Sequence, residues 1–464
     1  HDFPEARFTG IDLSAEQILA GQKQMEQLGL KNLRLEQMDI MDVTARLKDE
    51  GPYDYIICHG VFSWVPEHVQ EEILRSAQEM LSPNGLAVIS YNTMPGWAMV
   101  RAVRDMMLFH TKRFEDPSEK IKQAKILVKF LHENTKKGDP FHSALENELK
   151  LLASTNESYV MHEYLESENQ QFYFHEFYKK ARTHKLNYIG DSNLTTMYVG
   201  NLPEKAAEQL RAVGDIITQE QYMDFLRNRR FRWTILGRDS LVPDRNLQKT
   251  FIHNFLVESN LECTTANPDL HQNLHFRDRS KPALNLDTKD PPSSALFLAL
   301  ADNAGNPVST DELVEQAAAM DPAITPESVR NMIETLGHKL VFGGFLQLSL
   351  ERARHVREPG EKPEVYKPAR VQAEHPGAGW VTNMRRSKTL ISPVIRHLIL
   401  LLDGTRTRDQ VIAALADKFG QKQIPLDTDP GLKEMATAKS DEELAREIYD
   451  TFLPRLASRC LLAA

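Results

Sequence analysis

The first ninety residues alternate short apolar segments with helical ones, and this alternation restricts the fold more than any other feature. The pattern predicts, in chain order, a strand, a helix, a strand, a short helix, a strand, a helix and a strand. The longer of these elements are Arg7–Asp12, Ser14–Leu28, Leu33–Met38, Tyr53–Cys58, Val69–Leu81 and Leu86–Tyr91. We therefore predict an α/β domain with a parallel sheet, right-handed crossovers and ligands at the carboxyl ends of the strands.

The composition is that of a folded globular protein with several domains. The chain has 464 residues, of which 41% are apolar and 26% are charged. This balance excludes a disordered chain, a collagen and a disulfide scaffold. The length predicts two to four domains, and the net charge of −9 argues against a general nucleic-acid or membrane-surface binder.

The cysteines and apolar runs indicate a cytoplasmic protein without a metal site or a membrane span. Cys58, Cys263 and Cys460 are far apart, and no CxxC pair occurs. Free cysteines suit a reducing compartment. Runs such as Leu398–Leu402 are much shorter than the roughly 18 apolar residues that cross a bilayer. The chain begins at His1 without a signal peptide.

Two carboxylates follow successive predicted strands and are the first candidate ligand-binding residues. Asp12 ends one strand, where a carboxylate can accept hydrogen bonds from ribose hydroxyls, and Asp39 ends the next, where it can accept one from an adenine amino group. Ile11, Leu13 and Ile40 would provide apolar faces for the base. The alternative is that each Asp only caps a helix or forms a turn. We favour a nucleoside ligand because both acids recur in the correct order.

These segments resemble those of a class I S-adenosylmethionine-dependent methyltransferase. The similar segments are Gly10–Ser14, Gln37–Ile40, Tyr53–Pro66 and Leu81–Gly85. The resemblance implies a Rossmann-like sheet and S-adenosyl-L-methionine as cofactor. In this family a glycine-rich turn follows the first strand and lets the backbone approach the cofactor. That turn would lie just before His1, so we expect an incomplete sheet and weak or no activity for the sequence as given.

Two aromatic-rich segments resemble a particular group within this methyltransferase family. Ser90–Trp97 and His162–Phe177 are similar to those of bacterial methyltransferases that carry a methyltransferase regulatory domain. Members of that group include protein lysine methyltransferases that modify outer-membrane proteins. The resemblance therefore implies a protein substrate that is methylated on lysine side chains.

The transfer site is expected at the carboxyl ends of the fourth and fifth family strands. The resemblance and the position of these residues give the cofactor site Ile11, Asp12, Leu13, Asp39, Ile40, Cys58 and His59, and the substrate site Phe62, Ser63, Trp64, Tyr91 and Trp97. His59 and Tyr91 are the candidate catalytic residues, each able to orient the amine by a hydrogen bond. The alternative for Trp64 and Trp97 is that they pack a lid.

Other side chains have a structural alternative that we weighed against a functional one. His162 and His175 lie among aromatic residues that can line a channel for a lysine by cation–π attraction. Structural histidines are more common in such a place. Between Arg227 and Arg238 the chain carries its densest basic cluster. We expect these arginines to pair with nearby acids on a solvated surface rather than with an acidic partner or a phosphate.

The remaining chain divides into further predicted domains. We predict a methyltransferase domain at 1–240 with a helical insertion or regulatory domain at about 110–180, an irregular linker at 241–290, a winged-helix-like domain at 291–352, a Pro-rich linker at 353–379 and a second helical winged-helix-like domain at 380–464. In 186–190 and 231–236 we expect a sixth strand and an antiparallel seventh strand. Residues 340–342 and 345–350 are expected to form the hairpin of the first winged helix.

The first winged helix is predicted to bind protein rather than nucleic acid. Its candidate recognition helix, Thr325–Leu340, carries as many acidic as basic side chains near its surface, which suits phosphate contact poorly. We therefore expect docking or homodimerisation. Two alternatives to a protein lysine methyltransferase remain: a non-catalytic scaffold with a decayed cofactor site, and a small-molecule methyltransferase.

Overall fold

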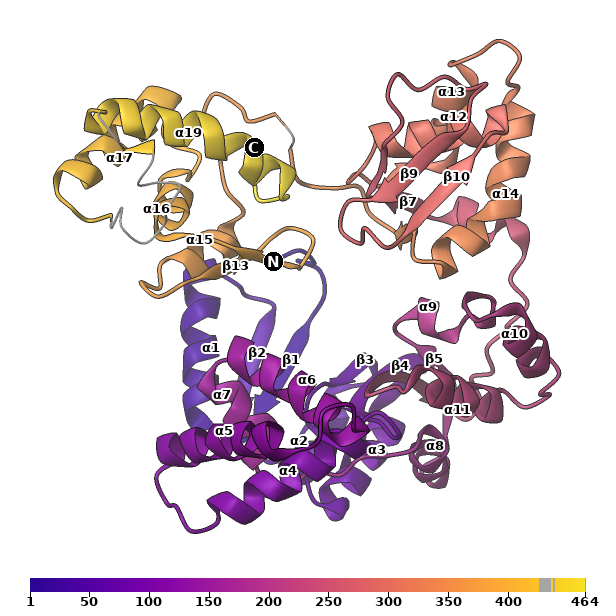
Figure 1. Cartoon of the computed structure of the whole chain (residues 1–464), viewed down its shortest axis with the longest axis vertical. Coiled ribbons are helices and arrows are strands. Elements are labelled where there is room, and N and C mark those ends of the chain that lie inside the picture. Colours follow the sequence, from indigo (N-terminus) through magenta and orange to yellow (C-terminus); the bar gives the residue numbers. More distant parts are fainter. Residues whose placement is uncertain (357, 425–434, 437–438, 464) are drawn as a thin grey trace. The chain divides into compact units, whose positions relative to one another are not determined.

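The computed structural model describes residues 1–356, 358–424, 435–436 and 439–463 (Figure 1). The chain forms two compact units. One contains residues 1–38 and 351–464, and the other contains residues 39–350. Each unit is described separately below.

A four-stranded sheet lies at the centre of the methyltransferase part of the second unit. Its order is β3 (Tyr53–Cys58), β4 (Leu81–Asn92), β6 (Phe231–Arg238) and β5 (Leu186–Asp191). β3 runs parallel to β4, whereas β6 is antiparallel to both β4 and β5. The predicted sixth strand and antiparallel seventh strand are therefore confirmed. Residues 83–85 also belong to β4, where the pairing with β3 is irregular between the pairs that Tyr53 and Tyr55 form.

Helices cover one face of this sheet, and large apolar side chains remain exposed on the other. α3 (Glu67–Met80) and α8 (Phe174–Thr183) pack their apolar residues onto β4 in one core cluster. On β3 the side chains alternate between the two faces. Tyr55 and Ile57 point to the uncovered face and are 69% and 71% exposed.

The first two strands form a separate sheet in the other unit. β1 (Phe8–Asp12) pairs in parallel with β2 (Leu33–Gln37), and α1 (Ala15–Leu28) connects them. Ser14 caps this helix, because its Oγ accepts a hydrogen bond from the Gln17 N–H. Gly29, at φ +70°, ends the helix in the left-handed conformation that glycine adopts without strain. The four strands predicted for residues 1–91 therefore belong to two sheets.

Helices form the segment between β4 and β5, where we predicted a helical insertion. It contains α4 (Ala98–Thr111), α5 (Pro117–Asn134), α6 (Pro140–Ser154), α7 (Glu157–Val160) and a π-helical turn, η4 (Met161–Leu165). Asp116 and Asp139 accept backbone hydrogen bonds ahead of α5 and α6, and a proline occupies the first turn of each helix. Their apolar faces share one core, and the helices lie together in Figure 1.

Residues 241–290 were predicted to be an irregular linker, but they contribute strands to the following domain. β7 (Leu256–Ser259) lies between β11 (Val308–Ser309) and β12 (Leu346–Ser349), and β8 (Leu261–Cys263), β9 (Leu274–Asp278) and β10 (Asn285–Thr288) form a second sheet. The polar composition obscured short strands in which every second residue is buried, as in β9. The helices α12 (Pro291–Asp302), α13 (Thr310–Ala318) and α14 (Pro326–Phe342) follow as predicted.

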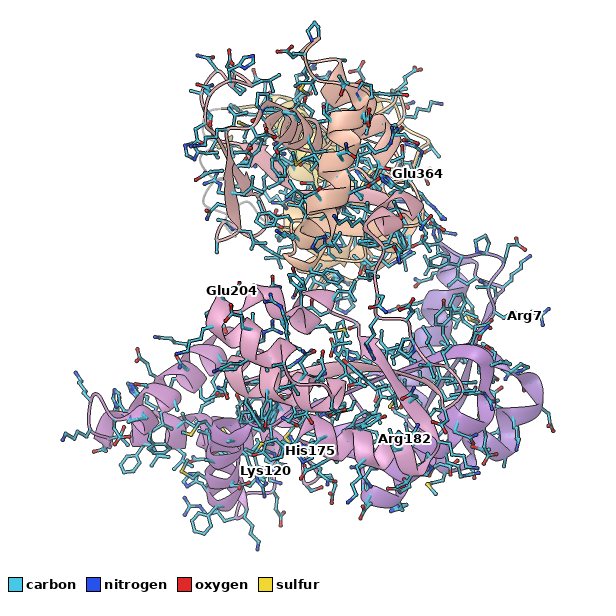
Figure 2. All side chains as sticks on the ribbon, turned by 90° about the vertical axis from the view of Figure 1, so that its right-hand side faces the viewer. Arg7, Lys120, His175, Arg182, Glu204 and Glu364 are labelled. Carbon is cyan, nitrogen blue, oxygen red and sulfur yellow. The ribbon has the colours of Figure 1, made fainter. Side chains whose placement is uncertain are left out.

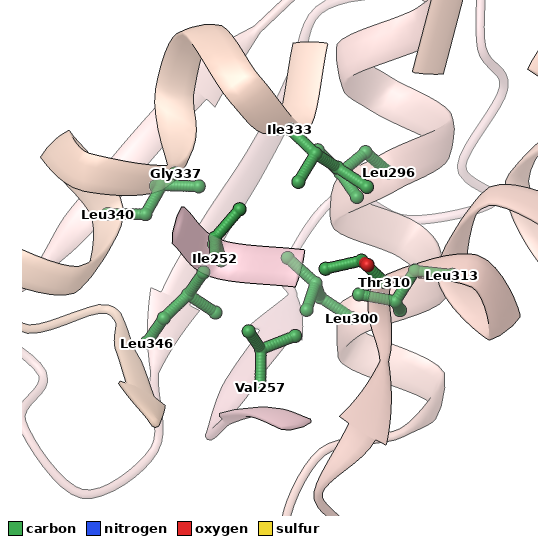
Figure 3. A pocket seen from close by; sticks show the side chains of 10 residues that line it. All are labelled: Ile252, Val257, Leu296, Leu300, Thr310, Leu313, Ile333, Gly337, Leu340 and Leu346. Atoms are coloured by element: carbon green, nitrogen blue, oxygen red, sulfur yellow. The ribbon is translucent and has the colours of Figure 1, made fainter. Parts of the chain in front are cut away.

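The hairpin expected at residues 340–350 does not form. α14 continues to Phe342, and β12 pairs with β7 instead. Leu340 and Val341 are buried by the helix, so their apolar character reflects the core and not a strand. A cavity of about 10 Å³ lies in this core, lined by Ile252, Thr310 and eight other residues. Figure 3 shows the side chains that line it. This volume holds about one water molecule, so the cavity is a packing gap and no ligand site.

The C-terminal residues pack in the same unit as β1, α1 and β2. They form α15 (Lys367–Ala373), β13 (Trp380–Thr382), β14 (Lys388–Leu390), α16 (Pro393–Leu401), α17 (Arg408–Gly420) and α19 (Asp441–Ser458). The Pro-rich segment is not wholly extended, because Pro368 lies in the first turn of α15, where proline is tolerated.

Shorter elements complete the described chain. They are η1 (Ile40–Asp42), α2 (Val43–Leu47), η2 (Lys48–Glu50), η3 (Phe62–Trp64), α9 (Leu194–Met197), η5 (Val199–Asn201), α10 (Glu204–Arg211), α11 (Ile216–Arg227) and η6 (Lys249–Asn254).

Candidate methyltransferase site

The two acids of the predicted nucleoside site each use one carboxylate oxygen in a local turn. Asp12 Oδ1 accepts a hydrogen bond of 2.7 Å from the Ser14 N–H, and Asp39 Oδ1 accepts one of 2.9 Å from the Met41 N–H. Both side chains are exposed. Among the described residues, no second hydrogen bond reaches either carboxylate. The turn therefore fixes each carboxylate and leaves its other oxygen for a ligand.

The strand register supports the order of the two acids. Asp12 is the register partner of Gln37, so the two parallel strands end at the same edge of their sheet. Asp39 follows Gln37 by two residues. Of the predicted apolar residues, Leu13 is 68% exposed, Ile11 is half-buried, and Ile40 packs against the core beside β4.

His59 follows β3 directly and is held by a serine of the neighbouring strand. Its Nδ1 lies 2.9 Å from Ser90 Oγ, and the same hydroxyl accepts a hydrogen bond of 2.9 Å from the Gly60 N–H. Gly60 has φ +71°, which glycine adopts readily at this tight turn. The imidazole is exposed and anchored at one nitrogen, so its other nitrogen faces outward.

Two aromatic residues that the sequence analysis did not include lie beside His59. The imidazole meets Phe231 and Trp233 edge-on, at centroid distances of 6.1 and 5.2 Å. Both belong to β6, and the register places Trp233 opposite Ser90. Phe231 and Trp233 are partly exposed. Their alternation around Arg232 predicts a shared face, but only the strand pairing brings that face to His59.

Burial keeps the Cys58 thiol uncharged. Burial raises the pKa of this thiol to about 12, although the Phe62 backbone opposes the shift. Cys58 therefore remains a neutral thiol at the end of β3.

Phe62 and Tyr91, which we predicted to line the substrate site, lie in the core. Phe62 is fully buried and packs against Phe172 and Phe177. The Tyr91 hydroxyl lies 2.9 Å from Thr234 Oγ1, and burial raises the tyrosine pKa above its ordinary value. In this structure Tyr91 has no contact with the surface, so His59 is the only one of the two catalytic candidates that solvent reaches.

The loop after β3 is tied to the end of β4. Ser63 Oγ accepts a hydrogen bond of 2.9 Å from the Asn92 N–H, so the side chain predicted to contact substrate fixes the backbone instead. Trp64 is half-buried, and its ring lies 4.4 Å from the His162 ring and 6.4 Å from the Trp97 ring. Trp97 itself is buried in the insertion core. Trp64 and His162 thus form the accessible part of an aromatic wall.

Arg229 and Arg232 of the basic cluster pair with acids of this chain, but these pairs are largely buried and do not lie on the solvated surface that we predicted. Arg232 is fully buried and donates two hydrogen bonds to the Asp224 carboxylate and one to the Glu220 carboxylate. Its guanidinium also lies 4.0 Å from the Phe174 ring centroid. Arg229 donates a hydrogen bond of 2.7 Å to Asp191. These contacts join β6 to α11 and β5.

His175 takes a structural position on α8. Its Nδ1 lies 2.9 Å from Gln221 Oε1 of α11, and Arg182, also on α8, pairs with Asp239. Figure 2 labels His175 and Arg182. The described residues contain no group of three or more potential metal ligands. Nor does any helix among them have the length and apolar character to cross a membrane.

Comparison with known proteins identifies the family. The family described as "Methyltransferase domain" matches residues 1–182, "Predicted methyltransferase regulatory domain" matches 156–238, and "PKMT, C-terminal winged helix domain" matches 361–461. PKMT2 from Rickettsia typhi, solved in complex with AdoHcy, is 30% identical at a TM-score of 0.89, covering 100% of this chain and 90% of PKMT2. The chain belongs to the PKMT methyltransferase family.

Two further comparisons agree with this assignment. A second structure of PKMT2 from Rickettsia typhi matches at a TM-score of 0.86 and 31% identity, with the same coverage of 100% and 90%. The uncharacterized protein RP789 of Rickettsia prowazekii is 35% identical over 99% of this chain and 82% of its own length. This PKMT-family methyltransferase therefore matches its relatives over nearly its entire sequence.

Proposed function

We propose that this methyltransferase transfers a methyl group from S-adenosylmethionine to lysine side chains of a protein. The observation that carries the proposal is the whole-chain match to PKMT2 in complex with AdoHcy, the product that S-adenosylmethionine leaves after methyl transfer. The match includes the regulatory and winged-helix regions as well as the methyltransferase domain. These additional regions favour a protein acceptor over a small molecule.

The residues at the ends of β1 and β2 fit the adenosine part of this cofactor. Asp12 and Asp39 are acceptors with an oxygen that no described residue uses, and the exposed Leu13 lies next to Asp12. We propose that Asp12 accepts the ribose hydroxyls and Asp39 accepts the adenine amino group, with Ile11, Leu13 and Ile40 as apolar neighbours. Cys58 and His59 complete the proposed cofactor site. The bound cofactor supplies an electrophilic methyl group on a sulfonium.

The acceptor amine must reach the site uncharged and oriented. Its nitrogen lone pair forms the new N–C bond while the C–S bond breaks, and the nitrogen loses a proton. A water-poor pocket lowers the pKa of a lysine amine, so a strong base is unnecessary. We propose that His59 orients the amine through its outward nitrogen. Trp64, Trp97 and His162 form the wall along which the lysine enters, where an ammonium group is stabilised by cation–π attraction.

The buried residues support this site indirectly. Ser63 holds the backbone of Asn92, and Phe62 and Tyr91 pack beneath the loop after β3. We propose positioning roles for these three side chains. We also propose that the enzyme works in the cytoplasm and that it forms a homodimer. Light scattering of the purified protein tests the homodimer directly.

Mass spectrometry with a deuterated cofactor tests the proposed reaction. The complete gene product is incubated with S-adenosylmethionine carrying a CD₃ group and with bacterial outer-membrane proteins, and the acceptors are digested and sequenced. We expect 17 Da increments, or multiples of them, on lysine (a CD₃ group replaces one hydrogen). Asp12→Ala removes the ribose contact and is expected to abolish the label. Label on small molecules alone, or equal labelling by Asp12→Ala, contradicts the proposal.

A further inference from the structure

An irregular segment of the regulatory region lies against the end of β4. Residues 166–173 connect η4 to α8, and residues 156–238 match the regulatory family. The Gln170 N–H donates a hydrogen bond of 2.7 Å to the Ser63 carbonyl, and the Phe172 N–H donates one of 3.0 Å to the Asn92 carbonyl. The segment is therefore fixed both to the loop after β3 and to the end of β4, beside the candidate transfer site.

Asn169 lies in this segment with its amide held in one orientation. Its Oδ1 accepts hydrogen bonds from Asn92 Nδ2 at 3.3 Å and from Gln171 Nε2 at 2.7 Å. Because both neighbours present donors, the oxygen of Asn169 must face them and its nitrogen must face the other way. The orientation of this amide follows from the hydrogen-bond network.

The Asn169 nitrogen has no acceptor. Among the described residues no hydrogen bond uses Nδ2, although the atom is shielded from solvent. An unsatisfied buried donor costs about 1–3 kcal/mol, so proteins rarely retain one without a use. The nearby Glu166 and Ser167 carbonyls accept hydrogen bonds from Arg104, and among the described residues neither accepts one from Asn169.

The residue that carries the orphan donor contacts β4 beside the proposed transfer site. Asn92 and Ser90 are two residues apart on β4, so their side chains point to the same face, roughly 7 Å apart. Ser90 holds His59 on that face. Asn169 contacts Asn92 and thus lies at the carboxyl edge of the sheet, where ligands of α/β folds bind.

We propose that Asn169 is a specificity-determining residue: once the binding acceptor protein displaces the groups that shield Nδ2, this nitrogen donates its N–H to a main-chain carbonyl beside the target lysine. This inference rests on the proposed function. A lysine ammonium offers only donors, and the lone pair of the neutral amine is used in the attack, so the lysine side chain cannot satisfy Asn169. A peptide carbonyl can, and every protein acceptor has one next to its lysine. The regulatory segment would thereby select proteins over free amines.

An isosteric substitution separates this role from a structural one. Asn169→Asp keeps the oxygen that Asn92 and Gln171 bind and replaces only the orphan donor with an acceptor. With an acceptor protein identified by the CD₃ experiment, we expect kcat/KM to fall about 10- to 100-fold, mainly through KM. The dissociation constant of AdoHcy and the melting temperature are expected to stay unchanged.

Two companion variants complete the test. Asn169→Ala removes the donor without adding a charge and is expected to raise KM similarly, which covers the case in which the aspartate variant folds poorly. Glu168→Gln changes the exposed neighbouring residue and is expected to behave as wild type. If wild type methylates protein and both Asn169 variants match its KM, the inference is wrong. It is also wrong if both lose AdoHcy affinity and thermal stability along with KM. Absence of methylation by wild type contradicts the proposed function instead.

Discussion

The arginines between residues 227 and 238 form hydrogen bonds and ion pairs with other groups of this chain. Arg227 donates to the carbonyls of Thr196 and Tyr198, and Arg238 donates to the Leu81 carbonyl. Arg232 is the most enclosed of them, with three buried acids around it. The sequence indicates a basic cluster, whereas its partners lie up to 157 residues away in the chain.

Loss of Arg232 is expected to destabilise the fold. Arg232→Met leaves Glu220 and Asp224 buried without their main counter-charge, at a cost of about 3–5 kcal/mol. Urea denaturation measures this change. Arg211→Met is the matched control, because Arg211 pairs at the surface with Glu204 and is expected to cost less than about 1 kcal/mol. Equal stability of the two variants contradicts this reading of the cluster.

Cys58 is expected to resist alkylation. Since burial raises its pKa to about 12, the folded protein keeps the thiol protonated until the pH approaches that value, and the thiolate fraction at pH 8 is about one in ten thousand. Iodoacetamide at pH 8, followed by peptide mass spectrometry, should leave Cys58 unmodified in the native protein. The same treatment after denaturation should modify it. Rapid native labelling would show an accessible thiolate.

At the scale of elements, local chemistry predicts helices better than strand partners. The helix starts at Ser14 and Ser309 were predictable, because each has a side chain that accepts the N–H three residues on. The end of α14 was not, since Leu340 and Val341 suit a strand as well as a buried helix turn. Phe231 and Trp233 were missed as site residues because nothing local shows that β6 pairs with β4 beside His59.

The residues of the candidate site also divide into those that the local sequence predicts and those that only the fold reveals. Asp12, Asp39 and His59 lie at the ends of strands, and the strand pattern alone located them. Phe62 and Tyr91 follow or end strands too, but their side chains point into the core, which depends on the packing of α8. Asn169 is more than 75 residues from Asn92 in the chain, so only the fold reveals their contact.

The contact between α1 and α15 is expected to stabilise the unit that contains Asp12, which comprises residues 1–38 and 351–464. Lys367 Nζ donates a hydrogen bond of 2.8 Å to the Leu28 carbonyl, at the end of α1 where the helix dipole favours a cation. Lys367→Met should cost about 0.5–2 kcal/mol there and speed amide hydrogen exchange in residues 15–38. Lys388→Met, in the same domain beside Trp380, is the control. Equal exchange in both variants would exclude this role for Lys367.

At the scale of the whole chain, its beginning and its end form one structural unit. Among residues 1–38 only Ile18 and Met38 are buried apolar side chains, which is too few for an independent core. The remaining support comes from the C-terminal residues, through contacts such as Gln27 with Glu374 and Tyr366 with Asp2. The winged-helix domain is therefore part of the structure that presents the proposed ribose-binding acid.

The central claim is that Asp12 and Asp39 hold the two ends of one adenosine. Calorimetric titration of the complete gene product with AdoHcy tests it most directly, with Asp12→Asn, Asp39→Asn and, as control, Asp54→Asn, whose carboxylate accepts only from Ser82 among the described residues. Each of the first two variants should weaken binding about 10- to 100-fold, because each loses a hydrogen bond to a charged group, and Asp54→Asn should bind as wild type does. Wild-type affinity in either the Asp12 or the Asp39 variant would contradict the account.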